Sequence, residues 1–221
     1  MQLPQGYAEP AGGREFDPAD FLQSFWRTTL DVLTRPVDFF RELPRQAGYG
    51  RPIVYYATAL VIYAVLTFIL ALLLPAASVD RLLSGGQSAQ EPTVAMEILT
   101  MILTVAFGLM GLFIGAGFIH VGVLLFGQTQ NPSYETTTRL TAYVSGATYM
   151  ISWIPFIGWL ASLYAIYLYI VAVREQYGIS TGRAAAAVLV PGLFLLLVVC
   201  LCIAVVGAAL FAALSGVRTS P

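Results

Sequence analysis

Charged residues are scarce in this chain. Only 10% of its 221 residues are Asp, Glu, Lys or Arg, whereas 58% are hydrophobic. A soluble domain carries about 25% charged and about 45–50% apolar residues, so a soluble protein of this length would lack the charge to cover its surface. The composition therefore excludes most soluble enzyme classes and indicates a polytopic membrane protein.

Lysine is absent, so all 11 basic residues are arginine, and the net charge of −1 gives no reason to expect nucleic acid as a partner. The two cysteines, Cys200 and Cys202, stand two positions apart in an apolar run. On a helix they face different sides and cannot form a disulfide with each other. The first 50 residues are polar and mixed in charge, unlike a secretory signal peptide.

Sequence motifs for catalysis and charged residues that could couple transport to ions are also missing. The sequence contains no phosphate-binding loop, no metal-binding quartet and no H-E-x-x-H motif. Acidic and basic residues occur only at the ends of the apolar runs, at Glu97, Arg139 and Arg174, whereas proton relays and ion-coupled transporters need them inside. We therefore predict that the protein is not an enzyme and has no cofactor.

The apolar residues predict an all-α fold with five transmembrane helices. A helix over 52–74 would be about 34 Å long, enough to cross a hydrocarbon core of about 30 Å. The uncharged run 140–173 would reach about 51 Å as one helix, so Pro155 and Gly158 predict a turn that divides it in two. A re-entrant hairpin is the alternative. The predicted transmembrane domain, 52–214, contains spans at 52–74, 98–126, 140–156, 157–173 and 188–214.

The predicted transmembrane domain is flanked by polar segments. We expect a disordered tail at 1–15, cytoplasmic amphipathic helices at 16–51 and a short outer tail at 215–221. Aromatic side chains on one face of such helices are typical of contact with a membrane surface or a partner. The alternative is that this face packs on the chain's own membrane domain. The residues predicted to make the surface contact are Phe21, Phe25, Trp26, Phe39 and Phe40.

Arginine distribution predicts the orientation. Nine arginines lie on the side that includes the N-terminal segment and the loops near 135 and 180, whereas the other side has only Arg81 and Arg218. The positive-inside rule places the first side in the cytoplasm. The C-terminus would then lie outside. The nine are Arg14, Arg27, Arg35, Arg41, Arg45, Arg51, Arg139, Arg174 and Arg183.

His120 is the single histidine and lies inside the second predicted span. An ionisable group in a membrane is a candidate for function, and His120 is a weak candidate for a ligand of a metal, a haem or a chlorin, because no second ligand accompanies it. The alternative is a hydrogen-bonded packing role. Near it, Gly108, Gly111 and Gly115 form a small-residue pattern that permits close helix approach, either inside the protein or in a dimer.

A stripe of hydroxyl side chains follows the third predicted span at spacings of four, three and four. One interpretation is that the stripe lines a pathway for a solute. The other is that its members make hydrogen bonds between helices, which we expect more strongly. The stripe consists of Thr141, Ser145, Thr148 and Ser152.

Three stretches resemble the Yip family of Ypt/Rab-interacting membrane proteins, in its prokaryotic branch. They are 35–43 (RPVDFFREL), His120 with 124–127 and 138–143, and 154–191 with its IPFIG and REQYGISTGRA segments. Two features differ: Tyr177 stands where many relatives have a histidine, and AGYGRP at 47–52 replaces the acidic-aromatic-glycine-proline motif of eukaryotic members. The resemblance implies a cytoplasmic N-terminal segment, five membrane helices and no enzymatic activity, and it gives no basis for Rab binding.

These observations predict a membrane scaffold or accessory subunit that binds other integral membrane proteins or organises the bilayer. The expected location is a bacterial inner membrane, and a homo-oligomer is possible. One alternative function is a passive transporter or small-solute channel lined by the hydroxyl stripe. Another is a peripheral subunit of a large bioenergetic or pigment complex, with His120 near a cofactor.

Overall fold

The computed structural model describes residues 15–73 and 93–217, and every element in those ranges is helical. The predicted tail at 1–15 lies outside the described residues except for Glu15, as do most of the loop at 75–97 and residues 218–221. The elements are η1 (Pro18–Asp20), α1 (Phe21–Thr34), α2 (Pro36–Glu42), α3 (Gly50–Leu73), α5 (Val94–Gly122), η3 (Val123–Gly127), α6 (Tyr134–Ser152), α7 (Ile157–Tyr177) and α8 (Thr181–Val217).

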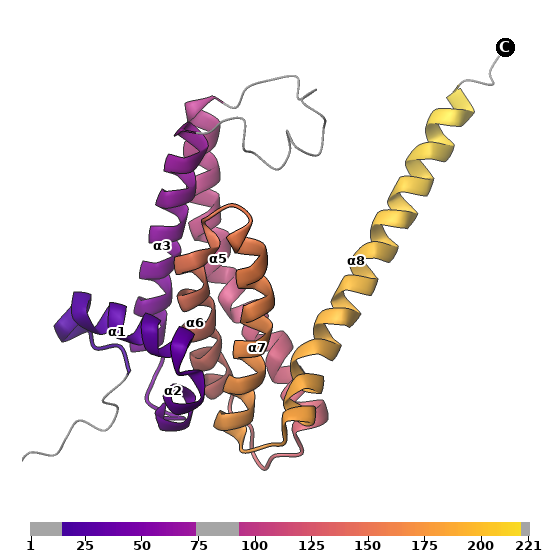
Figure 1. The fold of residues 1–221 in the computed structure, drawn as a ribbon. Helices are drawn as coiled ribbons and strands as arrows, with labels where there is room; N and C mark the ends of the chain where they lie inside the picture. Colours follow the sequence, from indigo (N-terminus) through magenta and orange to yellow (C-terminus); the bar gives the residue numbers. More distant parts are fainter. Residues whose placement is uncertain (1–14, 74–92, 218–221) are drawn as a thin grey trace, which may run out of the picture.

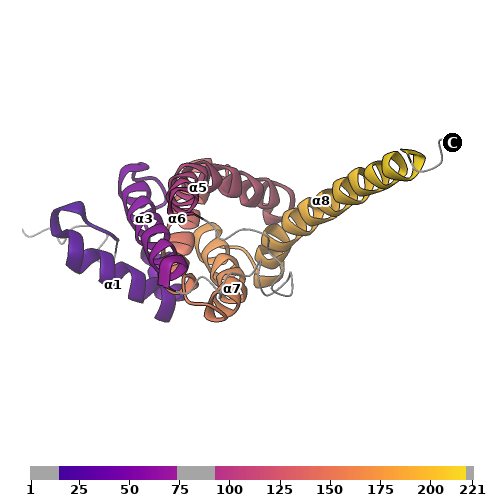
Figure 2. The same cartoon turned by 90° about the horizontal axis from the view of Figure 1, so that it is seen from above.

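Helices α3, α5, α6 and α7 form one bundle, with α1 and α2 against one of its ends (Figure 1). Both views show α1 running across the side of the bundle instead of along the bundle helices (Figure 2). Helix α8 contacts α5, η3 and α7 near its own beginning and then leans away. The N-terminal helices therefore occupy one end and one side of a membrane-type bundle.

Within the part of the chain that the structure describes, three helical stretches are long and apolar enough to cross a membrane: Gly50–Leu73, Val94–Gly127 and Ile157–Tyr177. Helix α6 does not have that composition, and it lies between α3, α5 and α7 with most of its residues buried. Neighbouring helices shield its polar side chains from lipid, so α6 can be polar where a lipid-facing helix cannot. Helix α8, at 37 residues, would be about 55 Å long.

The apolar run at 140–173 contains two helices, α6 and α7, joined by a turn over 153–156. Phe156 has a φ of 66°, a left-handed conformation that interrupts the helix directly after Pro155. A Cβ on Gly158 would lie 2.6 Å from the Ser152 carbonyl oxygen, so only glycine fits where α7 begins. The predicted turn therefore lies here, although α6 begins at Tyr134, six residues before the predicted span.

An aromatic cluster joins the N-terminal helices to the bundle. Tyr55 of α3 lies at its centre, with ring centroids 5.2 Å from both Phe25 of α1 and Tyr143 of α6. Phe39 of α2 contacts Tyr143 edge-on at 5.3 Å. All four rings are buried. Such pairs add about 0.5–1.5 kcal/mol beyond the burial of apolar area, so the cluster ties four helices together.

Close helix approach occurs at glycines, but only in part at those predicted. A Cβ on Gly108 would lie 2.6 Å from the Leu60 side chain, so this glycine does pack inside the bundle. A Cβ on Gly111 or Gly115 would meet no described atom of another helix within 4 Å, so the packing inside the protein that was expected at these two glycines is corrected. The tightest approach is instead at Gly122, where a Cβ would lie 1.9 Å from the carbonyl oxygen of Ala187 in α8.

We predict that Gly122→Ala destabilises the protein by about 1–3 kcal/mol, the usual cost of overpacking. The new methyl group meets backbone rather than a flexible side chain, so α5 and α8 must separate. Denaturant unfolding of the purified protein in detergent, followed by tryptophan fluorescence, measures the change. Gly115→Ala is the matched control and should not destabilise, because alanine is the better helix former. Equal denaturation midpoints for the two variants would contradict the close contact between α5 and α8 at Gly122.

Candidate functional site

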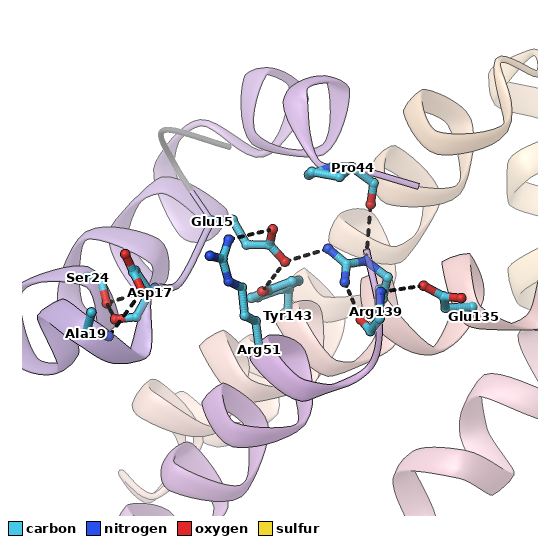
Figure 3. Close-up of polar contacts among 10 residues, drawn as sticks. Glu15, Asp17, Ala19, Ser24, Pro44, Arg51, Glu135, Arg139 and Tyr143 are labelled. Carbon is cyan, nitrogen blue, oxygen red and sulfur yellow. Dashed lines mark hydrogen bonds and ion pairs between the residues drawn. The ribbon is translucent and has the colours of Figure 1, made fainter. Parts of the chain in front are cut away.

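A buried arginine connects the N-terminal segment to the bundle. Arg139 lies one and a half turns into α6 and is fully buried. Its guanidinium donates to the carbonyl oxygens of Pro44, at 3.1 Å, and Gly48, and to the Glu15 carboxylate at 2.5 Å (Figure 3). The planar fork of an arginine suits several acceptors at once. The Arg139 side chain thus binds both Glu15, which precedes η1, and the α2–α3 connection.

Glu15 supplies the negative charge that a buried guanidinium requires. Its Oε1 accepts hydrogen bonds from Arg139 and from the Tyr143 hydroxyl at 2.9 Å, and its Oε2 lies 3.7 Å from Arg51. Figure 3 shows the carboxylate between these three side chains. Glu15 is only 3% exposed. The prediction of a disordered tail to residue 15 is therefore wrong at its last residue, because the tail ends in a buried ion pair.

Three further side chains hold the α2–α3 connection and the end of α2 against the bundle. Gln176 of α7 donates to the carbonyls of Phe40 and Leu43, the latter at 3.0 Å. These carbonyls lie at the C-terminal end of α2, where backbone acceptors have no partner within the helix. On α6, Thr136 donates to the Arg45 carbonyl at 2.8 Å, and Glu135 accepts from the Gly48 amide at 2.7 Å. The connection therefore has its backbone groups satisfied by side chains of α6 and α7.

An ion bridge lies at the same end of the bundle. Glu175 of α7 pairs with Arg41 of α2 at 3.1 Å and with Arg174 at 2.6 Å. Arg41 is largely exposed, so this pair contributes little stability compared with the buried pair of Arg139. These ion pairs matter because they bring arginines of α2 and α7 to the same end of the bundle as Arg139.

The predicted surface contacts divide into two groups. Phe25, Phe39 and Phe40 are at most 2% exposed and pack on the bundle, so their prediction as membrane or partner contacts is corrected. The alternative, packing on the chain's own membrane domain, holds for them. Phe21 and Trp26 are 39% and 55% exposed and remain available at the surface.

Helix α1 carries three different faces. Phe25, with buried Thr29 and Val32, covers the bundle, and Thr29 also contacts the Tyr55 hydroxyl at 2.9 Å. A second, exposed face is apolar, and a third is polar. At 100° per residue, the polar face lies opposite the buried face, and the apolar face lies between the two on one side of the helix. We call the exposed apolar face the α1 flank; it consists of Leu22, Trp26 and Leu30, whereas the polar face has Gln23, Arg27 and Thr34.

His120 takes part in a chain of hydrogen bonds. Its Nδ1 lies 3.0 Å from the Thr137 hydroxyl, which lies 2.6 Å from the Tyr177 hydroxyl, and Tyr177 donates to the Ser133 carbonyl at 2.9 Å. Among residues 15–73 and 93–217, no group of three metal-ligating side chains surrounds it. The geometry thus gives His120 a packing contact between α5 and α6, and its role as a cofactor ligand stays a prediction.

The hydroxyl stripe bonds mainly within its own helix. Thr141, Thr148 and Ser152 each donate to the backbone carbonyl four residues earlier, at 2.7–2.8 Å. Only Ser145 crosses to another helix, with its hydroxyl 2.6 Å from the Tyr169 hydroxyl of α7. The expectation of interhelical hydrogen bonds is right for Ser145 and is corrected for the other three. Such back-bonding satisfies a hydroxyl in an apolar helix without a second helix.

The roles of Glu15 and Gln176 and the depth of Arg139 do not follow from the sequence pattern. The pattern places Arg139 at the end of a span, because its partner Glu15 lies 124 residues away in the chain. The available signal was its position next to three consecutive threonines at the start of an apolar run. Such a run of polar residues with an arginine is typical of a buried polar junction as much as of a loop.

Comparison with known proteins gives one match. The family described as Yip1 domain matches residues 30–204 of the chain, a range that begins in α1 and ends in α8. Comparisons with curated proteins and with solved structures give no match. The family range includes Arg139 and Gln176 but not Glu15, so the acidic partner lies outside the matched domain.

We predict that Arg139→Met lowers the free energy of unfolding by about 3–5 kcal/mol, because it leaves the Glu15 carboxylate buried without its partner. Adding Glu15→Gln to Arg139→Met should recover part of that loss, since the unpaired charge disappears. Denaturant unfolding in detergent measures all variants. Arg27→Met, on the polar face of α1, is the control and should unfold like the wild type. Additive losses from the two changes would contradict the ion pair.

Proposed function

The chain belongs to the Yip1 domain family, and its apolar helices make it a membrane protein; we propose that it is a non-enzymatic scaffold or accessory subunit. Five helices, α3, α5, α6, α7 and α8, would span the bilayer. The α1 flank would lie in the cytoplasmic leaflet and would help to bind other integral membrane proteins or to organise lipid around the bundle.

The three faces of α1 are the observation that supports this proposal most. A helix on a soluble protein needs one buried and one polar face, whereas α1 has an exposed apolar face in addition. A helix in the interface has its apolar side in the acyl region and its polar side toward water. Because α1 runs across the bundle helices and its polar face borders the flank, the flank can face lipid while Gln23 and Arg27 lie toward the aqueous side.

The position of the arginines supports the orientation. Arg139 and Arg174 join Arg41 and Arg51 at the end of the bundle where the N-terminal helices pack. Under the positive-inside rule this end would be cytoplasmic, in a bacterial inner membrane, and an odd number of spans would place the C-terminus outside. A homo-oligomer stays a prediction.

We predict that Trp26 lies at the level of the lipid acyl chains. The variant Trp153→Phe/Trp159→Phe leaves Trp26 as the only one of the 3 tryptophans. In vesicles of phosphatidylcholine brominated near the headgroup end of its chains, we expect strong quenching by bromine and weak quenching by aqueous acrylamide. The control adds Trp26→Phe and Arg27→Trp, which moves the fluorophore to the polar face and should reverse both responses. Equal acrylamide quenching of the two proteins would exclude leaflet contact.

We predict that wild-type protein, purified from native membranes in mild detergent, carries integral membrane proteins in stoichiometric amounts. Leu22→Asp/Leu30→Asp should reduce that recovery by about tenfold, because charge on the flank costs several kcal/mol in the leaflet. Gln23→Ala/Arg27→Ala, on the polar face, should retain it. Mass spectrometry and size-exclusion chromatography of each preparation provide the readout. A wild-type protein that is pure and alone would refute the scaffold role.

A further inference from the structure

A partly polar groove lies between α3, α6 and α7. Its volume is about 380 Å³, within the range of pockets that hold small ligands. The polar lining comes from Tyr63 of α3, Ser145, Thr148 and Ser152 of α6, and Ser162 and Tyr169 of α7. Two of the three helices are apolar enough to cross a membrane. The groove therefore offers hydroxyl oxygens where lipid chains would otherwise surround the protein.

The hydrogen bonds made by these hydroxyls decide what the groove can recognise. Thr148, Ser152 and Ser162 donate their hydrogens to carbonyls of their own helices, at 2.8, 2.7 and 2.9 Å. A hydroxyl has one hydrogen and two lone pairs, so these three can only accept from a ligand. The hydroxyls of Ser145 and Tyr169 form one hydrogen bond, 2.6 Å long, which uses one of their two hydrogens. The other hydrogen remains for a ligand. Three of the lining oxygens thus only accept, whereas the donors include the hydrogen left on the Ser145–Tyr169 pair and the Tyr63 hydroxyl.

The charge of the lining residues restricts the chemical class of the ligand further. No Asp, Glu, Arg or His is among the residues that line the groove. A cationic donor such as an ammonium group would be buried there without a counter-ion, which is costly. The ligand that fits is uncharged and donates hydrogen bonds from a hydroxyl group.

The walls of the groove indicate where that ligand comes from. Ala165 and Ile166 of α7 complete the lining, and the rings of Tyr63 and Tyr149 stack at 4.9 Å on the opposite side. Ser162 and Ile166 are exposed, so the groove opens on the lipid-facing surface of α7. A ligand that arrives from the bilayer can leave its acyl chain against these apolar residues while its hydroxyl enters.

We propose that the groove binds the free hydroxyl of an uncharged glycerolipid, of the diacylglycerol class. The lipid hydroxyl would donate to the oxygen of Ser152 or Ser162, and an ester carbonyl would accept the remaining hydrogen of the Ser145–Tyr169 pair. Phosphatidylcholine has no donor for these oxygens, so the groove selects against it. This site is separate from the α1 flank, and either proposal can fail without the other.

Photo-crosslinking of the full-length protein in phosphatidylcholine nanodiscs tests the site. The probe is diacylglycerol with a diazirine near the glycerol end of one acyl chain, and peptide mass spectrometry locates the label. We expect label on α6 and α7 around the groove. Ser152→Ala/Ser162→Ala should reduce it by about tenfold, equivalent to about 1.4 kcal/mol. Unchanged labelling of this variant, or equal labelling by a phosphatidylcholine probe, would overturn the proposal.

Two controls keep the result interpretable. Thr58→Ala removes a hydroxyl that also bonds within its helix, to the Val54 carbonyl, but lies outside the groove, and it should label like the wild type. Excess diacylglycerol should displace the probe, whereas displacement by free glycerol would overturn the lipid assignment in favour of a soluble polyol. The α1 variants Leu22→Asp/Leu30→Asp should label normally, and a loss of groove labelling in them would overturn the independence of the two sites.

Discussion

The buried guanidinium of Arg139 organises the end of the bundle where the N-terminal helices pack. A charge without solvent has to be matched by a counter-ion and by acceptors for its hydrogens, and here Glu15 and the carbonyls of Pro44 and Gly48 provide them. Those acceptors belong to the N-terminal segment and to the α2–α3 connection. The need to satisfy one side chain therefore brings together parts of the chain that local sequence does not connect.

This constraint has a consequence for α1. With Glu15 paired before it and the α2–α3 connection held after it, α1 can contact the bundle with only one face, through Phe25 and Val32. The α1 flank then remains outside at a defined angle to the bundle helices. An interfacial helix on a free linker would sample many orientations, whereas α1 is part of the folded body, as a scaffold surface requires.

The polarity of α6 follows the same logic. Its hydroxyls and Arg139 are tolerated because α3, α5 and α7 surround it, and because most of its hydroxyls bond their own backbone. Between α3, α6 and α7, those satisfied hydroxyls line the groove instead of contacting a neighbouring helix. A helix that could not span a membrane alone thus supplies both the central packing and the proposed lipid site.

Residue type and spacing were enough to predict the all-helical class, the membrane setting, the turn before Gly158 and the family, because hydrophobic length and helix breakers act over short distances along the chain. They were not enough for the site. Whether Phe25 or Trp26 of the same helix faces outward, whether Gly111 or Gly122 meets a neighbour, and that Glu15 pairs with Arg139 all depend on what lies opposite in space. Only the packed bundle brings such partners together, since burial of a charge or a ring is a property of its surroundings rather than of its neighbours in sequence.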